Sequence, residues 1–139
     1  PGAGKGTQSK FIMEKFNLYQ LSTGDLLRSE IKNKTELGKK ISSIMNSGEL
    51  VSDEIVGNLI ENFVSNEIYK NKIIFDGYPR TLIQAKNLDS LLKRYNQKID
   101  IVLKLSVSLK TVKKRILERQ IQEKRDDDNE ETKEKIWNL

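Results

Sequence analysis

The first seven residues combine glycines, a lysine and a threonine at the spacing of a phosphate-binding loop. Gly2, Gly4 and Gly6 let the backbone curl so that its N–H groups can point at phosphate oxygens. The Lys5 ammonium suits the outer phosphates of a nucleotide, and the Thr7 hydroxyl is a typical ligand for Mg²⁺. These residues predict a nucleotide phosphate site. The alternative is an ordinary glycine-rich turn that contains a lysine.

A carboxylate that follows an apolar run supplies a second chemical group. Residues 73–75 are Ile-Ile-Phe and precede Asp76, which predicts a buried parallel strand with a carboxylate at its C-terminal end. Ligands bind at that end of the strands in open α/β sheets. We therefore expect Asp76 to hold Mg²⁺ through water together with Thr7, and Arg80 to reach the same cleft. The alternative is an aspartate that caps a helix or closes a turn.

Apolar residues at helical spacing predict the elements that must position these groups. The expected helices carry apolar residues, in chain order, within 11–16, 26–31, 41–45, 55–64, 85–92 and 109–116. Residues 22–25, Ser52 and Ser108 are expected to begin helices, Thr81 and Gln84 form a Thr-x-x-Gln capping box, and Gly48 is a typical helix end.

The strand pattern completes the predicted fold. Residues 18–21 are expected to be a short connector, and the apolar residues between Ile99 and Leu105 predict a second strand after the one at 73–75. Strands that alternate with helices predict βαβ units and a parallel sheet, and hence an α/β fold.

Composition excludes several classes of chemistry. The chain has 139 residues, a length typical of one domain, and contains neither cysteine nor histidine, so disulfides, a Cys/His zinc site and histidine acid/base catalysis are excluded. Any metal must be bound by oxygen. The apolar runs are shorter than a membrane span. We expect a soluble, cytoplasmic protein, or an organellar one if a targeting segment has been removed.

We expect most of the positively charged side chains to lie on solvated helix surfaces. The net charge is +5, from 25 Lys and Arg against 20 Asp and Glu, and the lysines alternate with glutamates along the chain. Such scattering does not favour a nucleic-acid partner. Arginines that lie beside the motifs are better suited to gripping phosphate; they are Arg28, Arg80, Arg115, Arg119 and Arg125.

Five ordered segments resemble the adenylate kinases, which belong to the nucleoside monophosphate kinase family. The segments are Pro-Gly-Ala-Gly-Lys-Gly-Thr-Gln at 1–8, Leu-Ser-Thr-Gly-Asp-Leu-Leu-Arg at 21–28, Gly-Glu-Leu-Val-Ser-Asp-Glu-Ile-Val at 48–56, Phe-Asp-Gly-Tyr-Pro-Arg-Thr at 75–81 and Asp-Asp-Asn-Glu-Glu-Thr at 127–132. The resemblance covers nearly the whole chain. It implies a reversible, Mg²⁺-dependent transfer of the terminal phosphoryl group of ATP to AMP, giving two ADP.

The resemblance also implies roles for individual residues. The donor ATP would be bound by Gly2, Ala3, Gly4, Lys5, Gly6, Thr7, Arg115 and Arg119. The acceptor AMP would be bound by Thr23, Arg28, Met45, Glu49, Leu50, Val51, Gly77, Arg80, Gln84 and Arg125. In this interpretation Gln84 reads the adenine edge. The catalytic set would be Lys5, Arg80, Arg115, Arg119 and Arg125, steadied at closure by Asp127 and Asp128, with Mg²⁺ held by Thr7 and Asp76 largely through water.

The fold that the resemblance implies is a three-layer P-loop domain, with a central parallel sheet flanked by helices. One domain would span 1–139, with its core in 1–21, 52–118 and 126–139, a small helical AMP-binding subdomain over about 22–51 and a short lid over about 119–125. A short lid without cysteines implies no zinc. The family's partners are small nucleotides, without nucleic acid or membrane, and a monomer is expected.

Two departures from the family pattern leave alternatives open. The resemblance implies that the family's first strand, the leading glycine of the loop and a C-terminal portion lie outside this sequence, and Lys135 and Ile136 stand where an arginine is usual. A nucleotide-binding fragment without turnover is therefore one alternative. A UMP/CMP kinase is another, although Thr23 and Gln84 favour AMP, and GTP is a less favoured donor. A nucleic-acid-binding module lacks the interleaved aromatic residues that such modules use.

Overall fold

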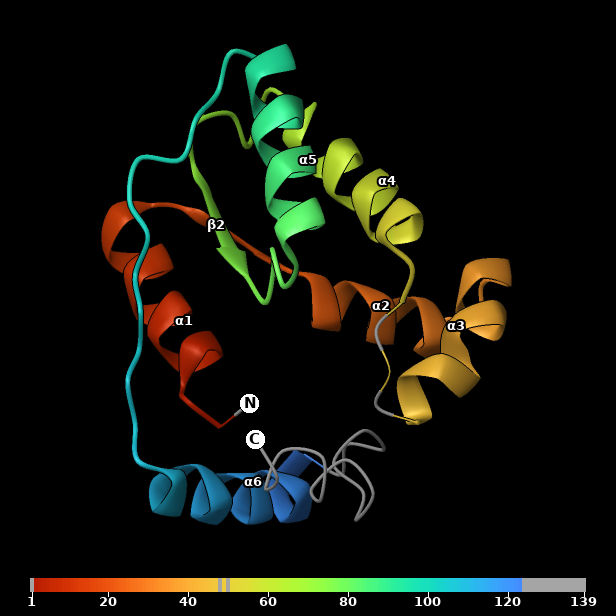
Figure 1. Cartoon of the computed structure of the whole chain (residues 1–139), viewed down its shortest axis with the longest axis vertical. Helices are drawn as coiled ribbons and strands as arrows, with labels where there is room; N and C mark the ends of the chain where they lie inside the picture. Colours follow the sequence, from red (N-terminus) through yellow and green to blue (C-terminus); the bar gives the residue numbers. More distant parts are fainter. Residues whose placement is uncertain (1, 48, 50, 124–139) are drawn as a thin grey trace.

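A computed structural model describes residues 2–47, 49 and 51–123 of the chain (Figure 1). The elements, in chain order, are α1 (Lys5–Phe16), β1 (Tyr19–Ser22), α2 (Thr23–Lys32), α3 (Glu36–Asn46), α4 (Asp53–Val64), β2 (Ile73–Asp76), α5 (Leu82–Arg94) and α6 (Leu109–Glu123). The α/β class is confirmed. Leu50, Arg125, Asp127 and Asp128, to which we assigned roles, lie outside the described residues.

β1 and β2 form a parallel pair, which is the whole sheet within the described residues. Tyr19 lies opposite Ile73 and Ser22 opposite Asp76, so both strands end at the same edge. The prediction of a connector at 18–21 was wrong. Residues 19–22, Tyr-Gln-Leu-Ser, form strand β1 because β2 supplies partners for their backbone hydrogen bonds. α1 lies on one side of the sheet, and α4 and α5 lie on the other (Figure 1).

Side-chain caps begin most of the helices as predicted. Ser22, Ser52 and Thr81 each accept a hydrogen bond from the backbone N–H three residues later, and so does Thr35 at α3. Ser108 does the same for Thr111 at the start of α6. α3 ends at Asn46 with Ser47 as its cap, and Gly48 lies outside the described residues.

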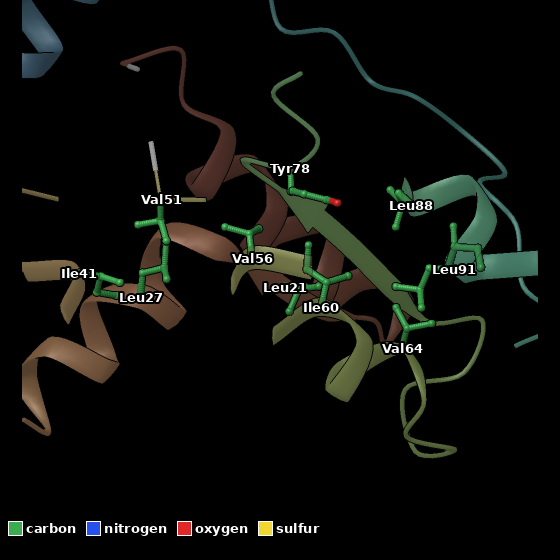
Figure 2. Close-up of a cluster of buried hydrophobic side chains, with 11 residues drawn as sticks. Leu21, Leu27, Ile41, Val51, Val56, Ile60, Val64, Tyr78, Leu88 and Leu91 are labelled. Atoms are coloured by element: carbon green, nitrogen blue, oxygen red, sulfur yellow. The ribbon is translucent and has the colours of Figure 1, made fainter. Parts of the chain in front are cut away.

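One hydrophobic core joins the sheet to the helices on its α4–α5 side. Figure 2 shows Leu21 of β1 beside Ile60 of α4, with Tyr78 and Leu88 nearby. α2 and α3 extend this core away from the sheet, through Leu27 and other buried residues. α1 covers the opposite face less completely. Phe11 and Phe16, which belong to the apolar residues of the helix expected over 11–16, are more than 60% exposed.

The segment between α5 and α6 differs from the prediction. The apolar residues from Ile99 to Leu105 have no regular secondary structure, and the side chains of Ile101, Val102 and Leu103 are 67–84% exposed. The predicted strand is wrong in the described structure because no described segment pairs with it. The chain instead runs along the edge of the molecule to α6 (Figure 1). Within the described part of the chain, no helix is long and apolar enough to cross a membrane.

α6 continues through Glu123, so the backbone at 119–123 is helical. We had expected this stretch to begin a short lid loop over about 119–125. Residues 124 and 125 lie outside the described residues, and the role of 119–125 as a lid stays a prediction.

Candidate active site

The phosphate-binding loop is built by left-handed backbone and leads directly into α1. Gly2 and Gly4 have φ values of 72° and 88°, a region that is accessible to glycine without a steric penalty. Gly4 is the N-cap of α1, with no side-chain cap, so the first N–H groups of the helix remain available to an anion. Lys5 and Thr7 lie in the first turn and are exposed. This geometry leaves backbone N–H groups at the start of α1 for an anion, and the binding of a triphosphate there stays a prediction.

α6 closes one side of this loop. A methyl group added at Gly2 would lie 3.1 Å from Val112 Cγ1 and 3.3 Å from Ile116 Cγ1, and Ile116 is fully buried. The Arg115 Nη1 donates to the carbonyl oxygens of Gly2 and Ala3, both at 3.4 Å. The structure thus brings Arg115 to the loop, although 110 residues and more separate them in sequence. The family resemblance also implies that Arg115 lies against the donor adenine, and that contact stays a prediction.

Asp76 lies beside the first turn of α1. Its Oδ2 atom accepts a hydrogen bond from Gln20 Nε2 at 2.8 Å, and a methyl group added at Gly6 would lie 3.5 Å from the same oxygen. The Asp76 carboxylate therefore lies within van der Waals reach of the first turn of α1. Among the described residues, Gln20 is the only side chain bonded to Asp76, and it leaves Oδ1 for another ligand.

The residues near the loop suit a bound Mg²⁺. This ion prefers oxygen ligands, retains several waters and is commonly held by one or two carboxylates together with substrate phosphates. Asp76 and Thr7 supply a carboxylate and a hydroxyl at the same end of the sheet. No group of three or more His, Cys, Asp or Glu side chains in the described ranges could hold a metal by itself.

Thr23, Gly77 and Arg80 form a second cluster just beyond β2. Thr23 Oγ1 and Arg80 Nε both donate to the carbonyl oxygen of Gly77, at 3.2 and 2.7 Å. Gly77 has a φ of 77°, and a methyl group added there would lie 3.2 Å from Arg80 Nη2. The side chain of Arg80 is thus held through Nε, which orients its remaining guanidinium N–H groups. These three predicted AMP-binding residues do come together.

Gln84 joins α5 to α4 from a buried position. Its Oε1 accepts a hydrogen bond from the backbone N–H of Arg80 at 2.7 Å, and its Nε2 donates to Asp53 Oδ1 at 2.6 Å. The predicted Thr81–Gln84 capping box is therefore half formed. Thr81 caps the Gln84 N–H, but the Gln84 side chain turns to Arg80 and Asp53 and does not return to Thr81.

Tyr78 packs beside this pair. Its hydroxyl donates to the carbonyl oxygen of Gln84 at 3.3 Å. Burial, and secondarily the negative charge of Asp53, raise the pKa of the Tyr78 phenol above its usual value of 10.0. The Tyr78 hydroxyl therefore stays protonated, and able to donate a hydrogen bond, at a higher pH than the hydroxyl of a free tyrosine.

The remaining predicted residues are placed less directly. Arg28 pairs with Asp25 at 2.6 Å on α2, and Met45 packs against the core. Glu49 is exposed, whereas Val51 is buried among core residues. Arg119 lies on α6. The roles assigned to these residues stay predictions.

Sequence reasoning missed two residues that this geometry brings into the site, Gln20 and Asp53. Gln20 was overlooked because residues 18–21 were interpreted as a connector, and its bond to Asp76 follows from the β1–β2 pairing. The signal for Asp53 was its place inside the segment 48–56. A carboxylate in the first turn of a helix is so common that it carried no functional meaning by itself.

Comparisons with known proteins place these features in context. The family described as adenylate kinase matches residues 1–138. An adenylate kinase of Pelagibacter ubique is 50% identical over 124 residues, which are 89% of this chain and 58% of that protein. Adenylate kinases of Azobacteroides pseudotrichonymphae and Leptospira biflexa are 48% and 46% identical over 132 residues, 95% of this chain and 69% and 71% of theirs. This chain thus spans 58–71% of the length of these relatives.

Proposed function

This chain belongs to the adenylate kinase family, and from that premise we propose that it transfers the terminal phosphoryl group of ATP to AMP, reversibly and with Mg²⁺, giving two ADP. The observation that carries the proposal is the meeting of two groups at the C-terminal edge of the sheet. The loop before α1 approaches Asp76, while Arg80 and Thr23 gather on Gly77, the next residue. This arrangement supports a donor site and an acceptor site side by side at one edge of the sheet.

On the donor side, the proposal assigns phosphate binding to the backbone N–H groups of residues 2–6 and to Lys5. The positive end of α1 adds its dipole, because Gly4 leaves the first N–H groups of the helix without side-chain partners. Arg119, on α6, and Arg125 are proposed to neutralise the transferring group, and Arg115, also on α6, is proposed to lie against the donor adenine. Phosphoryl transfer needs little covalent chemistry from a protein, so alignment and charge neutralisation suffice.

On the acceptor side, Arg80 and Arg28 are proposed to bind the phosphate of AMP. The Gly77 carbonyl anchors Arg80 through Nε, which prepares its outer N–H groups for a bidentate contact with phosphate oxygens. Thr23 and Gln84 are proposed to contact the nucleoside. The acceptor phosphate is already an anion, so the reaction requires no general base, and holding it in line with the donor lowers the entropic part of the barrier.

When bound, Mg²⁺ would neutralise and orient the donor phosphates, and Thr7 and Asp76 are the residues that would hold it, in part through water. Gln20 would keep the Asp76 carboxylate in place through Oδ2. A second-sphere bond of this kind fixes the direction in which the other oxygen points.

The test is phosphorus NMR of the protein with Mg²⁺ and ATP and, in separate samples, AMP, CMP, UMP or GMP. ADP formed with AMP alone is the expected result. Turnover that favours CMP or UMP would assign the chain to the pyrimidine nucleotide kinases instead. Absence of ADP in every sample, from protein whose circular dichroism spectrum is that of a folded α/β domain, would contradict the proposal and favour nucleotide binding without turnover.

Arg80→Ala tests the residue assignment, with Lys86→Ala as its matched control. Both variants remove one exposed cation near or on α5, but only Arg80 bonds to Gly77. Loss of a bidentate phosphate contact should lower kcat/KM for AMP by roughly 100-fold or more while leaving thermal stability nearly unchanged. Lys86→Ala should retain activity. Equal kcat/KM in the two variants would remove Arg80 from the site.

A further inference from the structure

The orientation of the Gln84 amide is fixed at both ends by the protein. Gln84 is 3% exposed. Its Oε1 lies 2.7 Å from the backbone nitrogen of Arg80, and its Nε2 lies 2.6 Å from Asp53 Oδ1. A backbone N–H can only donate and a carboxylate can only accept, so the two partners determine which end of the amide is oxygen and which is nitrogen.

A flipped amide would be strongly disfavoured. Rotation by 180° would place the Gln84 oxygen against the Asp53 carboxylate and its NH₂ group against the Arg80 N–H. Two acceptors and two donors would then face each other in a buried place, where unmatched polar groups are costly. Arg80 N–H is part of the same turn as Gln84, whereas Asp53 comes from the first turn of α4. Asp53 is thus the partner that a substitution can change.

The two bonds leave a definite hydrogen-bonding capacity. An amide has two N–H donors and two lone pairs on oxygen, and the bonds to Asp53 and Arg80 use one of each. One donor and one acceptor remain, in a fixed order along the edge of the amide. The Watson–Crick edge of a 6-aminopurine has an acceptor at N1 beside a donor at the 6-amino group. A 6-oxopurine has the reverse order, a donor at N1 beside an acceptor at O6.

We propose that Asp53 is a positioning residue that fixes the polarity of the Gln84 amide and thereby selects 6-aminopurine over 6-oxopurine nucleotides at the acceptor site. This inference rests on the proposed function, because it takes Gln84 to face the acceptor base. Since Gln84 is desolvated before any base arrives, a base of the wrong polarity leaves buried groups unpaired, which is the most discriminating form of rejection.

The competing explanation is that Asp53 only stabilises α4. A carboxylate in the first turn of a helix interacts favourably with the helix dipole. Glu54 is the next residue of the same turn, is exposed, and makes no hydrogen bond to Gln84. Glu54→Gln therefore removes the same charge from the same turn without touching the Gln84 amide, and it is the matched control for Asp53→Asn.

The experiment compares the full chain with Asp53→Asn, Asp53→Glu and Glu54→Gln. Binding of AMP and of IMP is measured by calorimetry, and initial rates with Mg²⁺ and ATP are measured for both acceptors. An asparagine can donate or accept, so either amide orientation becomes satisfied. Asp53→Asn should therefore reduce the preference for AMP over IMP by about tenfold or more. Glu54→Gln should keep the parent's preference, and Asp53→Glu, which retains an acceptor, should recover most of it.

A purely structural role would lower stability or both affinities together without changing their ratio. An unchanged AMP/IMP ratio in folded Asp53→Asn would overturn the proposal. If Asp53→Asn fails to fold, two other measurements test the proposal. They are the AMP/IMP ratio of Asp53→Glu and the side-chain NMR signals of Gln84 in the parent chain. These signals, assigned by their loss in Gln84→Glu, should show one slowly exchanging N–H near the Asp53 side chain. A freely rotating, rapidly exchanging NH₂ group would overturn the inference.

The binding measurements also separate this inference from the proposed function. A parent chain that binds AMP over IMP but forms no ADP would contradict phosphoryl transfer, while the affinity ratio of the variants would still test Asp53. A parent chain that transfers phosphoryl groups at equal rates to AMP, giving ADP, and to IMP, giving IDP, would uphold phosphoryl transfer and overturn the inference. A parent chain that binds neither nucleotide would overturn both.

Discussion

Residues 19–97 and residues 98–123 contain similar proportions of apolar side chains, yet they bury them very differently. All eleven buried residues of the central hydrophobic cluster lie between Leu21 and Leu92. In the second region Ile116 is the buried hydrophobic residue of the described part, whereas Ile101, Val102 and Ile121 are each at least 75% exposed. Apolar patterning alone therefore does not determine burial.

An apolar sequence pattern forms a strand only where another strand is available to pair with it. Tyr19–Ser22 is weaker as a strand signal than Ile99–Leu105, but it forms β1 because β2 supplies a ladder partner. A helix satisfies its own backbone, so α6 forms within the second region while the predicted strand beside it does not. Substitutions in both regions test this difference in burial.

The largest expected effect comes from removing a core side chain. Ile60→Ala truncates a fully buried residue of α4 and should lower the free energy of unfolding by about 4 kcal/mol, from lost transfer energy and the cavity left behind. Ile101→Ala, at a position 75% exposed, should change it by less than about 0.5 kcal/mol. Urea unfolding followed by circular dichroism measures both. Equal effects would mean that residues near Ile101 are buried in solution.

The next effect tests how closely α2 and α3 pack. A methyl group added at Gly38 would overlap the carbonyl group of Glu30, so Gly38→Ala should force the helices apart and cost about 2–3 kcal/mol. Gly57, in α4, has no atom within 4 Å of the same added group. Gly57→Ala should therefore stabilise by about 0.5–1 kcal/mol through helix propensity. Two shifts of the same sign in thermal unfolding would contradict this packing.

A smaller, local effect tests how the second region is attached. Ile116 is the buried contact of α6 and lies near Gly2, so Ile116→Ala should cost about 2 kcal/mol, mostly as loss of amide protection in α6. Leu117→Ala, at a position 45% exposed, is the control and should cost less than about 1 kcal/mol. Hydrogen exchange measured element by element distinguishes the two. Uniform loss of protection across α2–α5 would show that α6 is integral to the core.

The smallest effect concerns alkaline pH and the first region. The pKa of Tyr78 is raised by burial and then by Asp53, so folded Tyr78 keeps its proton above pH 10, where an unfolded tyrosine loses it. Unfolding then releases a proton, and the stability contributed by Tyr78 is lost as the pH rises from 10 through the folded-state pKa. Tyr78→Phe should reduce this decline and cost about 0.5–1 kcal/mol at pH 8. Unfolding curves between pH 8 and 11 measure both; parallel pH profiles would refute the assignment.

The candidate site was predictable to the extent that it depends on local motifs. The loop at Gly2–Thr7, the carboxylate of Asp76 and the cation of Arg80 each follow from short segments with known chemistry. The contacts of Gln20 and Asp53 did not follow, because they join residues 56 and 31 positions apart. Such pairs depend on strand register and on how α4 approaches α5, and a single sequence contains no local signal for either.

Most helix caps, the glycine-rich loop, the strand that ends at Asp76 and the family could be predicted from the sequence alone, because these depend on the chemistry of neighbouring residues. Tertiary structure decided which apolar segments are buried. It made a strand of Tyr19–Ser22 and left Ile99–Leu105 irregular, and it turned the Gln84 amide from the helix cap toward Asp53. The physical reason is the same in each case: backbone ladders, buried amides and apolar surfaces are satisfied by partners distant in sequence, and only the folded chain supplies them.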